Sequence, residues 1–556
     1  MSYTLKSVRA PKLRGRALKS LVAALDSPLT RRFIEYTLLR EAGLPRFRSQ
    51  PLDTPPLMQP VNLAATGAPI GQPPARVLDA LVKAPLPTRL PGILDFHAAY
   101  REGRTTPSDV AERLIARLEE LDRTPFNPVV FRNDQNIRAQ ARESTQRWQR
   151  GRPLSLLDGV PVAVKDELDL VPYATTAGTR VFGQDGSAQD DATACARLRQ
   201  AGALFIGKTH MHEIGMGVTG HNTHYGPARN PWDMTRYTGG SSSGSAAAVA
   251  LGLCPVALGA DGGGSIRIPA ALCGISGLKP TWGRVSEHGA FPLCPSVAHI
   301  GPMGLTADDL AIVYSLIAGP DVMDSHTLHQ PMVTLDLYPD LRGLRIGIYT
   351  PWFSDASPEV VQACQLGVER MKQLGAEVHA VMPEDLDNAR VAHAVTIASE
   401  MLASVWSAFQ RTPEAFGMET RLNLAMARAF TAADYVRAQQ VRQQLMDTLN
   451  NLFQQVDLLV TPTTGITAPP IPESALPDGE SDLKTLTALM RFAFVGNLSG
   501  IPALTLPVGQ DGCGLPVGLQ LMASHWQESR LLAVARCLMQ DEPAPAAPGA
   551  RSLLTD

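Results

Sequence analysis

The chain has 556 residues, of which 44% are apolar and 19% are charged. This composition supplies enough apolar residues for a large core and excludes a mostly disordered chain. The formal net charge is only −3, so overall electrostatics give no indication of a nucleic-acid partner. Glycine (46 residues) and proline (45 residues) are both frequent, which indicates many turns and loops around a packed body.

Seven cysteines are spread along the chain, and none of them belongs to a Cys-x-x-Cys pair. An odd number with this spacing predicts neither a disulfide framework nor a zinc ribbon. No apolar run reaches about 18 residues, and the N-terminus lacks the apolar segment of a secretory signal. We therefore expect a cytoplasmic protein.

The first 48 residues are strongly basic, with eleven Lys and Arg against three Asp and Glu. A first helix is predicted from apolar residues at helical spacing, namely Leu18, Leu21, Val22 and Leu25. A second helix is predicted to start at Ser27 and Pro28, to end at Gly43, and to carry an apolar face of Leu29, Phe33, Tyr36 and Leu39. Such helices bind a membrane surface or cover an apolar ligand, but they also pack on the protein body or on a second subunit. The sequence leaves both interpretations open.

Composition divides the chain into four segments. Residues 1–50 form the predicted helical pair, and residues 51–92 hold ten prolines and predict an extended linker on the surface. Residues 93–541 form the body of the protein. Residues 542–556 are rich in Pro and Ala and predict a flexible tail.

Within the body, predicted strands and helices alternate. Strands are predicted at 159–165, 203–207 and 255–259, and helices at 190–201 and 243–251. A second unit of this kind spans 344–381, and strands at 457–460 and 503–506 are predicted to return to the first sheet. The alternation predicts an α/β fold with a large, mixed, mostly parallel sheet flanked by helices.

Two Gly/Ser segments stand out, one around Ser241 and one around Ser265. Neither ends in the Gly-Lys-[Ser/Thr] of a phosphate-binding loop. Gly240-Ser-Ser-Ser-Gly244 fits the pattern of a nucleophile elbow, but a Ser-His-Asp triad would then depend on His525, the one histidine in a suitable late loop. A serine nucleophile activated by Lys165, at the end of an apolar strand, is the third interpretation. By itself, a lysine at a strand end is more often a solvated charge or an ion-pair partner.

Together with Gly159-Val-Pro-Val-Ala-Val-Lys-Asp166, the two segments closely resemble the amidase signature family. The resemblance spans about 157–319 and resumes at 457–463, 500–503 and 514–520. It implies the amidase signature fold and a Ser–cis-Ser–Lys triad. In that triad Ser265 is the nucleophile, Ser241 is the bridging serine, and Lys165 is the base.

The resemblance also implies the groups that surround the triad. The backbone amides of the oxyanion hole correspond to Gly262, Gly263, Gly264 and Ser265. Ser242, Asp261 and Arg267 are expected to support the network. Three consecutive glycines let the backbone wrap closely around a developing oxyanion, which agrees with this assignment. The implied reaction is the hydrolysis of a carboxylic amide through an acyl-enzyme, with no cofactor and no metal.

One branch of the family, the plant-type fatty acid amide hydrolases, is similar over nearly the whole chain. The shared segments are 10–15, 211–217, 237–244, 261–264, 461–469 and 490–492. This similarity implies N-acylethanolamines or related fatty acid amides as substrates, a role in lipid metabolism, a homodimer, and N-terminal helices that face a membrane. Substrate contacts are expected at Met216, Val218, Gly239, Gly240 and Phe492. Val218 stands where the branch has a threonine, so the preferred acyl group is expected to differ.

Three alternatives stay open at this point. A hydrolase of smaller amides, anilides or carbamates would use the same triad with a different pocket. A glutamine-dependent amidotransferase subunit shares the core but needs partner subunits, and a lipid-binding protein without activity would not need Lys165, Ser241 and Ser265. The motif His210-Met-His212-Glu213 lacks the His-Glu-x-x-His spacing, so no metal site is predicted.

Overall fold

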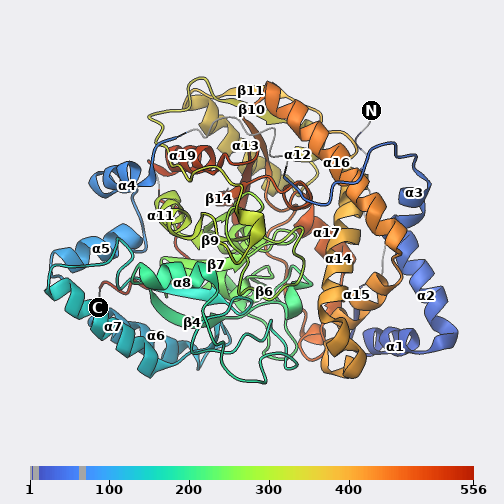
Figure 1. The fold of residues 1–556 in the computed structure, drawn as a ribbon, viewed down its shortest axis with the longest axis horizontal. Coiled ribbons are helices and arrows are strands. Elements are labelled where there is room, and N and C mark those ends of the chain that lie inside the picture. Colours follow the sequence, from blue (N-terminus) through green and yellow to red (C-terminus); the bar gives the residue numbers. More distant parts are fainter. Residues whose placement is uncertain (1–2, 4, 6–11, 62–70, 542, 556) are drawn as a thin grey trace.

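The computed structural model describes residues 3, 5, 12–61, 71–541 and 543–555. Its centre is one sheet of eleven strands with helices on both faces (Figure 1). In order across the sheet, the strands are β11 (Glu377–Ala380), β10 (Arg345–Ile348), β12 (Leu458–Pro462), β15 (Pro516–Met522), β14 (Ala503–Gln510), β8 (Ser276–Lys279), β9 (Ile300–Gly304), β7 (Val256–Ala260), β3 (Pro161–Lys165), β4 (Leu204–Thr209) and β2 (Val129–Phe131). Two further pairs are short, β1 (Leu13–Arg14) with β13 (Glu480–Ser481) and β5 (Arg229–Asn230) with β6 (Asp233–Tyr237).

The helices form the layers around this sheet. Those before the second Gly/Ser segment are α1 (Gly15–Asp26), α2 (Pro28–Glu41), α3 (Leu44–Ser49), α4 (Pro74–Lys83), α5 (Ile93–Arg101), α6 (Pro107–Leu121), α7 (Asp134–Gln149), α8 (Thr193–Gln200) and α9 (Ser243–Ala250). Those after it are α10 (Arg267–Cys273), α11 (Ala307–Ile317), α12 (Thr350–Phe353), α13 (Pro358–Gln373), α14 (Leu386–Arg411), α15 (Met418–Arg428), α16 (Ala432–Gln455), α17 (Leu483–Met490), α18 (Phe494–Leu498) and α19 (Glu528–Met539).

The prediction of an α/β fold with a large mixed sheet is confirmed, but the sheet is not mostly parallel. Strands β3, β4 and β7 pair in parallel because helices α8 and α9 cross between them. In the middle, β9, β8, β14 and β15 pair antiparallel with one another. The β14–β15 connection is a short turn at 511–515, and such a turn produces an antiparallel pair.

The two predicted N-terminal helices are present as α1 and α2, on the side of the molecule formed by α14, α15 and α16 (Figure 1). Helix α1 buries its predicted apolar face against α15, in a cluster of Leu18, Val22, Leu25, Leu422 and Ala425. Helix α2 behaves differently, because Leu29, Phe33 and Tyr36 are 93%, 75% and 60% exposed. Gly43 follows α2 with φ of +93°, the left-handed conformation expected of a glycine after a helix end.

The segment 51–92 and the tail depart from the expected extended and flexible states. Helix α4 forms inside the proline-rich segment, because Val77 and Leu81 lie one turn apart and both join the main core. In the tail, Leu553 is buried, and the Arg117 side chain donates a hydrogen bond to Gly549 O at 2.7 Å. Residues 543–555 are therefore held against the body.

Among the described helices, none combines the length and the apolar composition that crossing a membrane requires.

Candidate active site

Lys165 is the last residue of the fully buried strand β3, and its side chain is 1% exposed. Its Nζ donates a hydrogen bond to Ser241 Oγ at 2.8 Å and another to Ala260 O at 3.1 Å. The same nitrogen lies 2.6 Å from Glu167 Oε2, so the ion-pair role expected of a lysine at a strand end is also present. The structure thus brings the predicted base and the predicted bridging serine into direct contact inside the protein.

The loop that carries Ser241 connects this lysine to the second Gly/Ser segment. The Gly240–Ser241 peptide bond is cis, as the family resemblance implied. The Ser242 N–H donates to Ser265 O at 3.2 Å, and the Ser242 hydroxyl donates to Ala260 O at 3.3 Å. Ser242 therefore fastens the loop of the bridging serine to the strand end and the turn that precede α10.

Ser265 lies on the turn between β7 and α10, and the residue is 5% exposed. Its side chain faces a cavity and makes no hydrogen bond within the part of the chain that the structure describes. Ser265 is therefore held next to the Ser241 loop through its backbone, while its hydroxyl is left available to a ligand in the cavity.

The three glycines before Ser265 sit where a side chain would collide with its surroundings. A Cβ atom would lie 2.7 Å from Cys294 Sγ at Gly262, 2.8 Å from Met490 Cε at Gly263 and 2.6 Å from Ile268 Cδ1 at Gly264. Gly264 also has φ of +110°, a conformation that disfavours other residues. Its N–H donates to Asp261 Oδ1 at 2.6 Å, so one of the four predicted oxyanion amides is already engaged here.

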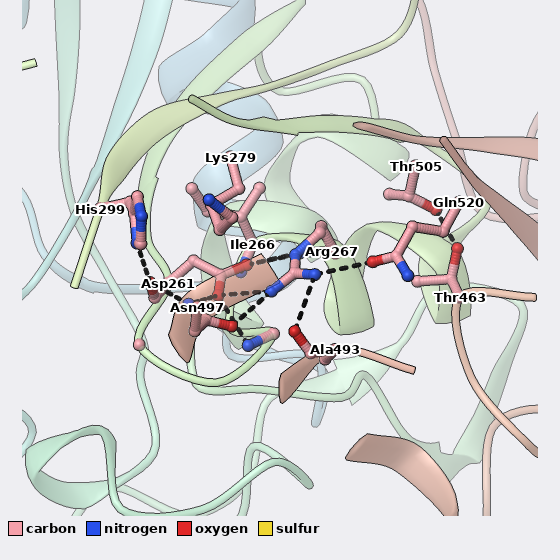
Figure 2. Close-up of polar contacts among 12 residues, drawn as sticks. Asp261, Ile266, Arg267, Lys279, His299, Thr463, Ala493, Asn497, Thr505 and Gln520 are labelled. Atoms are coloured by element: carbon pink, nitrogen blue, oxygen red, sulfur yellow. Dashed lines mark hydrogen bonds and ion pairs between the residues drawn. The ribbon is translucent and has the colours of Figure 1, made fainter. Parts of the chain in front are cut away.

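Asp261 and Arg267 form a buried ion pair that braces this turn from within (Figure 2). Arg267 Nε lies 3.0 Å from Asp261 Oδ2, and both side chains have no exposed surface. Burial alone would raise the pKa of Asp261, but the Arg267 guanidinium overcomes this and holds that pKa well below its usual value. Arg267 also donates to Asn497 Oδ1 at 2.6 Å and to Gln520 Oε1 at 2.7 Å, which ties the turn to α18 and β15.

The cavity at Ser265 has a volume of about 180 Å³ and lies between the glycine turn, α14 and α17. Most of its wall is apolar, and the lining side chains include Met216, Val218, Ile397, Met401, Met426, Leu486, Met490 and Phe494. The polar lining residues are Ser265, Arg390, His393, Asn423, Thr487 and Arg491. This arrangement presents one serine hydroxyl to an apolar ligand.

Two of the five predicted substrate contacts line this cavity, namely Met216 and Val218. Gly239 and Gly240 do not: a Cβ atom would lie 3.1 Å from Pro269 Cα at Gly239 and 2.8 Å from Gly220 N at Gly240, so neighbouring backbone occupies the space beside them. Phe492 is also in the core, where its ring packs 5.5 Å from that of Trp352. Its neighbours Met490, the last residue of α17, and Phe494, the first residue of α18, line the cavity instead.

One face of α14 forms a large part of the cavity wall, and none of its residues was among the predicted substrate contacts. The lining residues Arg390, His393, Ala394, Ile397, Ala398 and Met401 follow the spacing of a single helix face. That spacing was visible in the sequence, but it predicts burial and not the cavity that the face meets. His393 Nε2 lies 2.8 Å from Gly262 O, and burial lowers the pKa of His393 to about 4, so the neutral ring donates this hydrogen bond.

The histidines considered above have other partners. Burial lowers the pKa of His210 to about 4 and that of His212 to about 3. Glu213 is paired with His224 and accepts hydrogen bonds from α15, and no group of three or more candidate metal ligands occurs among the described residues. His525 Nε2 contacts two carbonyl oxygens, those of Pro60 and Ser499, and no serine hydroxyl.

Comparisons with known proteins agree with this geometry. A model of the Amidase family matches residues 109–532. The fatty acid amide hydrolase of Oryza sativa subsp. indica is 41% identical over 570 aligned positions, which cover 96% of this chain and 93% of that protein. A glutamyl-tRNA(Gln) amidotransferase component from Chloroflexus aggregans is 37% identical, and the alignment covers 79% of this chain and 93% of that protein. The structure of the native peptide amidase from Stenotrophomonas maltophilia superimposes with a TM-score of 0.72 at 30% identity, covering 84% of this chain and 99% of that one.

Proposed function

The chain belongs to the amidase family and is an amide-cleaving hydrolase, and we propose that it hydrolyses fatty acid amides such as N-acylethanolamines to a fatty acid and an amine. One observation carries the proposal: Ser265 lines an apolar cavity, and the neighbouring loop, bonded to Ser265 O through Ser242 N–H, holds Ser241 Oγ 2.8 Å from Lys165 Nζ. The similarity to fatty acid amide hydrolases supports the same substrate class and a role in lipid metabolism.

The proposed mechanism uses three side chains. Ser265 Oγ attacks the amide carbonyl, and its proton passes through Ser241 to Lys165, whose Nζ lies 2.8 Å from Ser241 Oγ. Lys165 then returns the proton through Ser241 to the leaving amine. Water cleaves the resulting ester by the reverse relay, and the scheme requires no cofactor.

The negative charge of the tetrahedral intermediate needs hydrogen-bond donors on the glycine turn. Because Asp261 already holds the Gly264 N–H, the proposal assigns this role to the N–H groups of Gly262, Gly263 and Ser265. Asp261 and Arg267 keep the turn in place without contacting the substrate, and Ser242 holds the relay loop against it.

A second candidate, hydrolysis of smaller amides, anilides or carbamates, is favoured by the size of the cavity. Its volume of about 180 Å³ lies below the roughly 300 Å³ at which pockets for drug-sized ligands begin. A short acyl or aryl group would fill it without any movement, whereas a long acyl chain would extend beyond this volume.

The exposed face of α2 supports two further proposals. Leu29, Phe33 and Tyr36 are unpaired apolar groups, and exposed basic side chains such as Arg32 and Arg40 lie on the same helix. We propose that this face makes peripheral contact with a membrane surface, which would deliver lipid amides to the cavity. The alternative is that a second copy covers the face in a homodimer, as the resemblance implied.

The first experiment compares rates on purified protein. N-oleoyl and N-myristoyl ethanolamine are run against a short-chain acyl amide, with Ser265→Ala as the control. A long-chain preference that is lost in Ser265→Ala supports the proposal. A short-chain or aryl preference, lost in the same variant, assigns the second candidate. Activity that survives in Ser265→Ala would overturn the triad, and activity that appears only with added partner subunits and glutamine would assign an amidotransferase.

A further inference from the structure

Positively charged side chains line the cavity, and a neutral fatty amide substrate has no group to pair with them. The lining residues include Arg390 and Arg491 but, within the described part of the chain, no Asp or Glu. Arg491 is neutralised by Asp355, which its guanidinium contacts directly. Arg390 is not neutralised in the same way.

Among the described residues, Arg390 has one acidic partner, and it shares that partner with another arginine. Arg390 Nη2 lies 3.2 Å from Asp387 Oδ1, while Arg46 Nη1 lies 3.2 Å from Asp387 Oδ2. One carboxylate therefore serves two guanidinium groups and leaves one positive charge in excess. Arg390 Nε is buried and has no hydrogen-bond partner among the described residues. The Arg390 side chain is 19% exposed, so the accessible part of its guanidinium can donate charge-assisted hydrogen bonds to an anionic ligand.

The position of Arg390 along α14 defines which part of a substrate it meets. His393, one turn further on, contacts Gly262 O, and the Ile397 side chain also reaches the Gly262 position. At a rise of about 1.5 Å per residue, Arg390 lies about 4.5 Å along the axis from His393, whereas Met401 lies about 12 Å away in the other direction. Beyond His393, the lining residues of α14 are all apolar.

We propose that the cavity accepts long-chain N-acyl amino acids, with the acyl chain along the face that ends at Met401 and the amino-acid carboxylate at Arg390. This inference rests on the amide hydrolysis proposed above. Arg390 lies only one helix turn from His393, which contacts the glycine turn. A carboxylate at the far end of an acyl chain could not reach Arg390 while the amide lies at that turn. The carboxylate that pairs with Arg390 therefore belongs to the amine half of the substrate.

The proposed hydrolysis needs no reactant other than the substrate and water. The bond between the acyl carbon and the amide nitrogen breaks, and a bond to Ser265 Oγ forms. The proton from Ser265 goes to the leaving nitrogen, and water then gives the fatty acid. The amino-acid carboxylate is unchanged throughout, so Arg390 acts only in binding and orientation.

The test compares N-lauroylglycine with N-lauroyl ethanolamine, which differ mainly by the carboxylate. The expected result is that Arg390→Gln lowers the ratio of their kcat/KM values about tenfold or more, since hydrogen bonds to charged groups have this magnitude. Arg390→Lys is expected to retain part of the ratio, because it keeps the charge but not the planar donors. Arg411→Gln, an exposed arginine at the other end of α14, removes the same charge and is expected to leave the ratio unchanged.

The other possible outcomes distinguish failure of this inference from failure of the proposed function. A wild-type protein that cleaves the ethanolamide but not the glycine conjugate would overturn this inference and leave the proposed function standing. An equal loss on both substrates in Arg390→Gln would also overturn it, because it would show that Arg390 only supports the fold. If the wild type cleaves neither substrate and a fluorophosphonate does not label Ser265, the proposed function itself fails.

Discussion

The turn from Asp261 to Arg267 buries and pairs its polar side chains, whereas helix α2 exposes apolar side chains to solvent. In the turn, the charged and amide groups are paired in a fully buried network that spans the loop, α18 and β15 (Figure 2). On α2, Leu29 and Phe33 are almost fully exposed to solvent. The turn holds its atoms in fixed positions, as a catalytic site requires. Helix α2 leaves an apolar surface to which a membrane or another protein chain can bind. The predictions below test this contrast.

The largest effect is expected for Lys165→Met. The variant removes the proposed base, so kcat/KM should fall by about 10²–10⁴-fold, the usual contribution of a general base. It also strands Glu167, which lies 2.6 Å from Lys165 Nζ and is buried. The double variant Lys165→Met/Glu167→Gln should therefore regain thermal stability but not activity. Recovery of activity in the double variant would show that Lys165 has only a structural role.

Asp261→Asn is expected to destabilise the protein strongly. It leaves Arg267 as a buried charge without a counter-charge, which typically costs about 3–5 kcal/mol. Glu112→Gln breaks an exposed ion pair with Arg138 and should change stability by less than about 1 kcal/mol. Urea unfolding of both variants measures the difference, and equal effects would contradict the contrast between buried and exposed pairing.

The same contrast explains what could be predicted from the sequence. Helix α6 was predictable because its apolar residues are periodic and because Thr106 and Asp109 form a capping box at its start. Strand β3 and the two Gly/Ser turns were predictable for similar local reasons. These elements carry Lys165, Ser241 and Ser265, but only the resemblance to the amidase signature family, and no local pattern, implied the roles of these three residues.

Features that depend on distant partners could not be predicted. Nothing local to Phe492 indicates that Trp352, 140 positions away in the sequence, covers its ring. The cavity on one face of α14 also depends on distant segments, since the glycine turn and α17 form its other walls. The antiparallel centre of the sheet follows from strand order, and strand order is set by packing across the whole chain.

Acid is expected to weaken the region around the site by a moderate amount. Burial lowers the pKa of His210, His221 and His393 to about 4, below the value of about 6.5 in an unfolded chain. The unfolded state therefore binds more protons as the pH falls, and the free energy of unfolding decreases between about pH 6.5 and pH 4. Each such histidine contributes at most about 1.4 kcal/mol per pH unit.

Thermal unfolding at pH values from 7.5 to 4.5 checks this expectation. His393→Gln removes one titrating group and should make the fall of Tm with pH less steep. His329→Gln, at an exposed position, should leave the pH dependence as it is in the wild type. A Tm that stays constant down to pH 4.5 would contradict the proposed burial of these rings as neutral groups.

Variants of the exposed face of α2 are expected to have the smallest effect on stability. Their effect on binding to lipid vesicles is expected to be large. Changing Leu29, Phe33 and Tyr36 together to serine should alter the free energy of unfolding by about 0.5 kcal/mol or less per site, because these side chains are already in solvent. Co-sedimentation with vesicles of phosphatidylcholine and phosphatidylglycerol should decrease, since apolar insertion and anionic lipid both favour binding of such a helix. Serine at Val322, Met323 and Met332, which are similarly exposed but lie outside α2, should leave vesicle binding unchanged. If the α2 variant instead dissociates a dimer and still binds vesicles, the exposed face belongs to a second copy of the chain, and lipid must reach the cavity by another route.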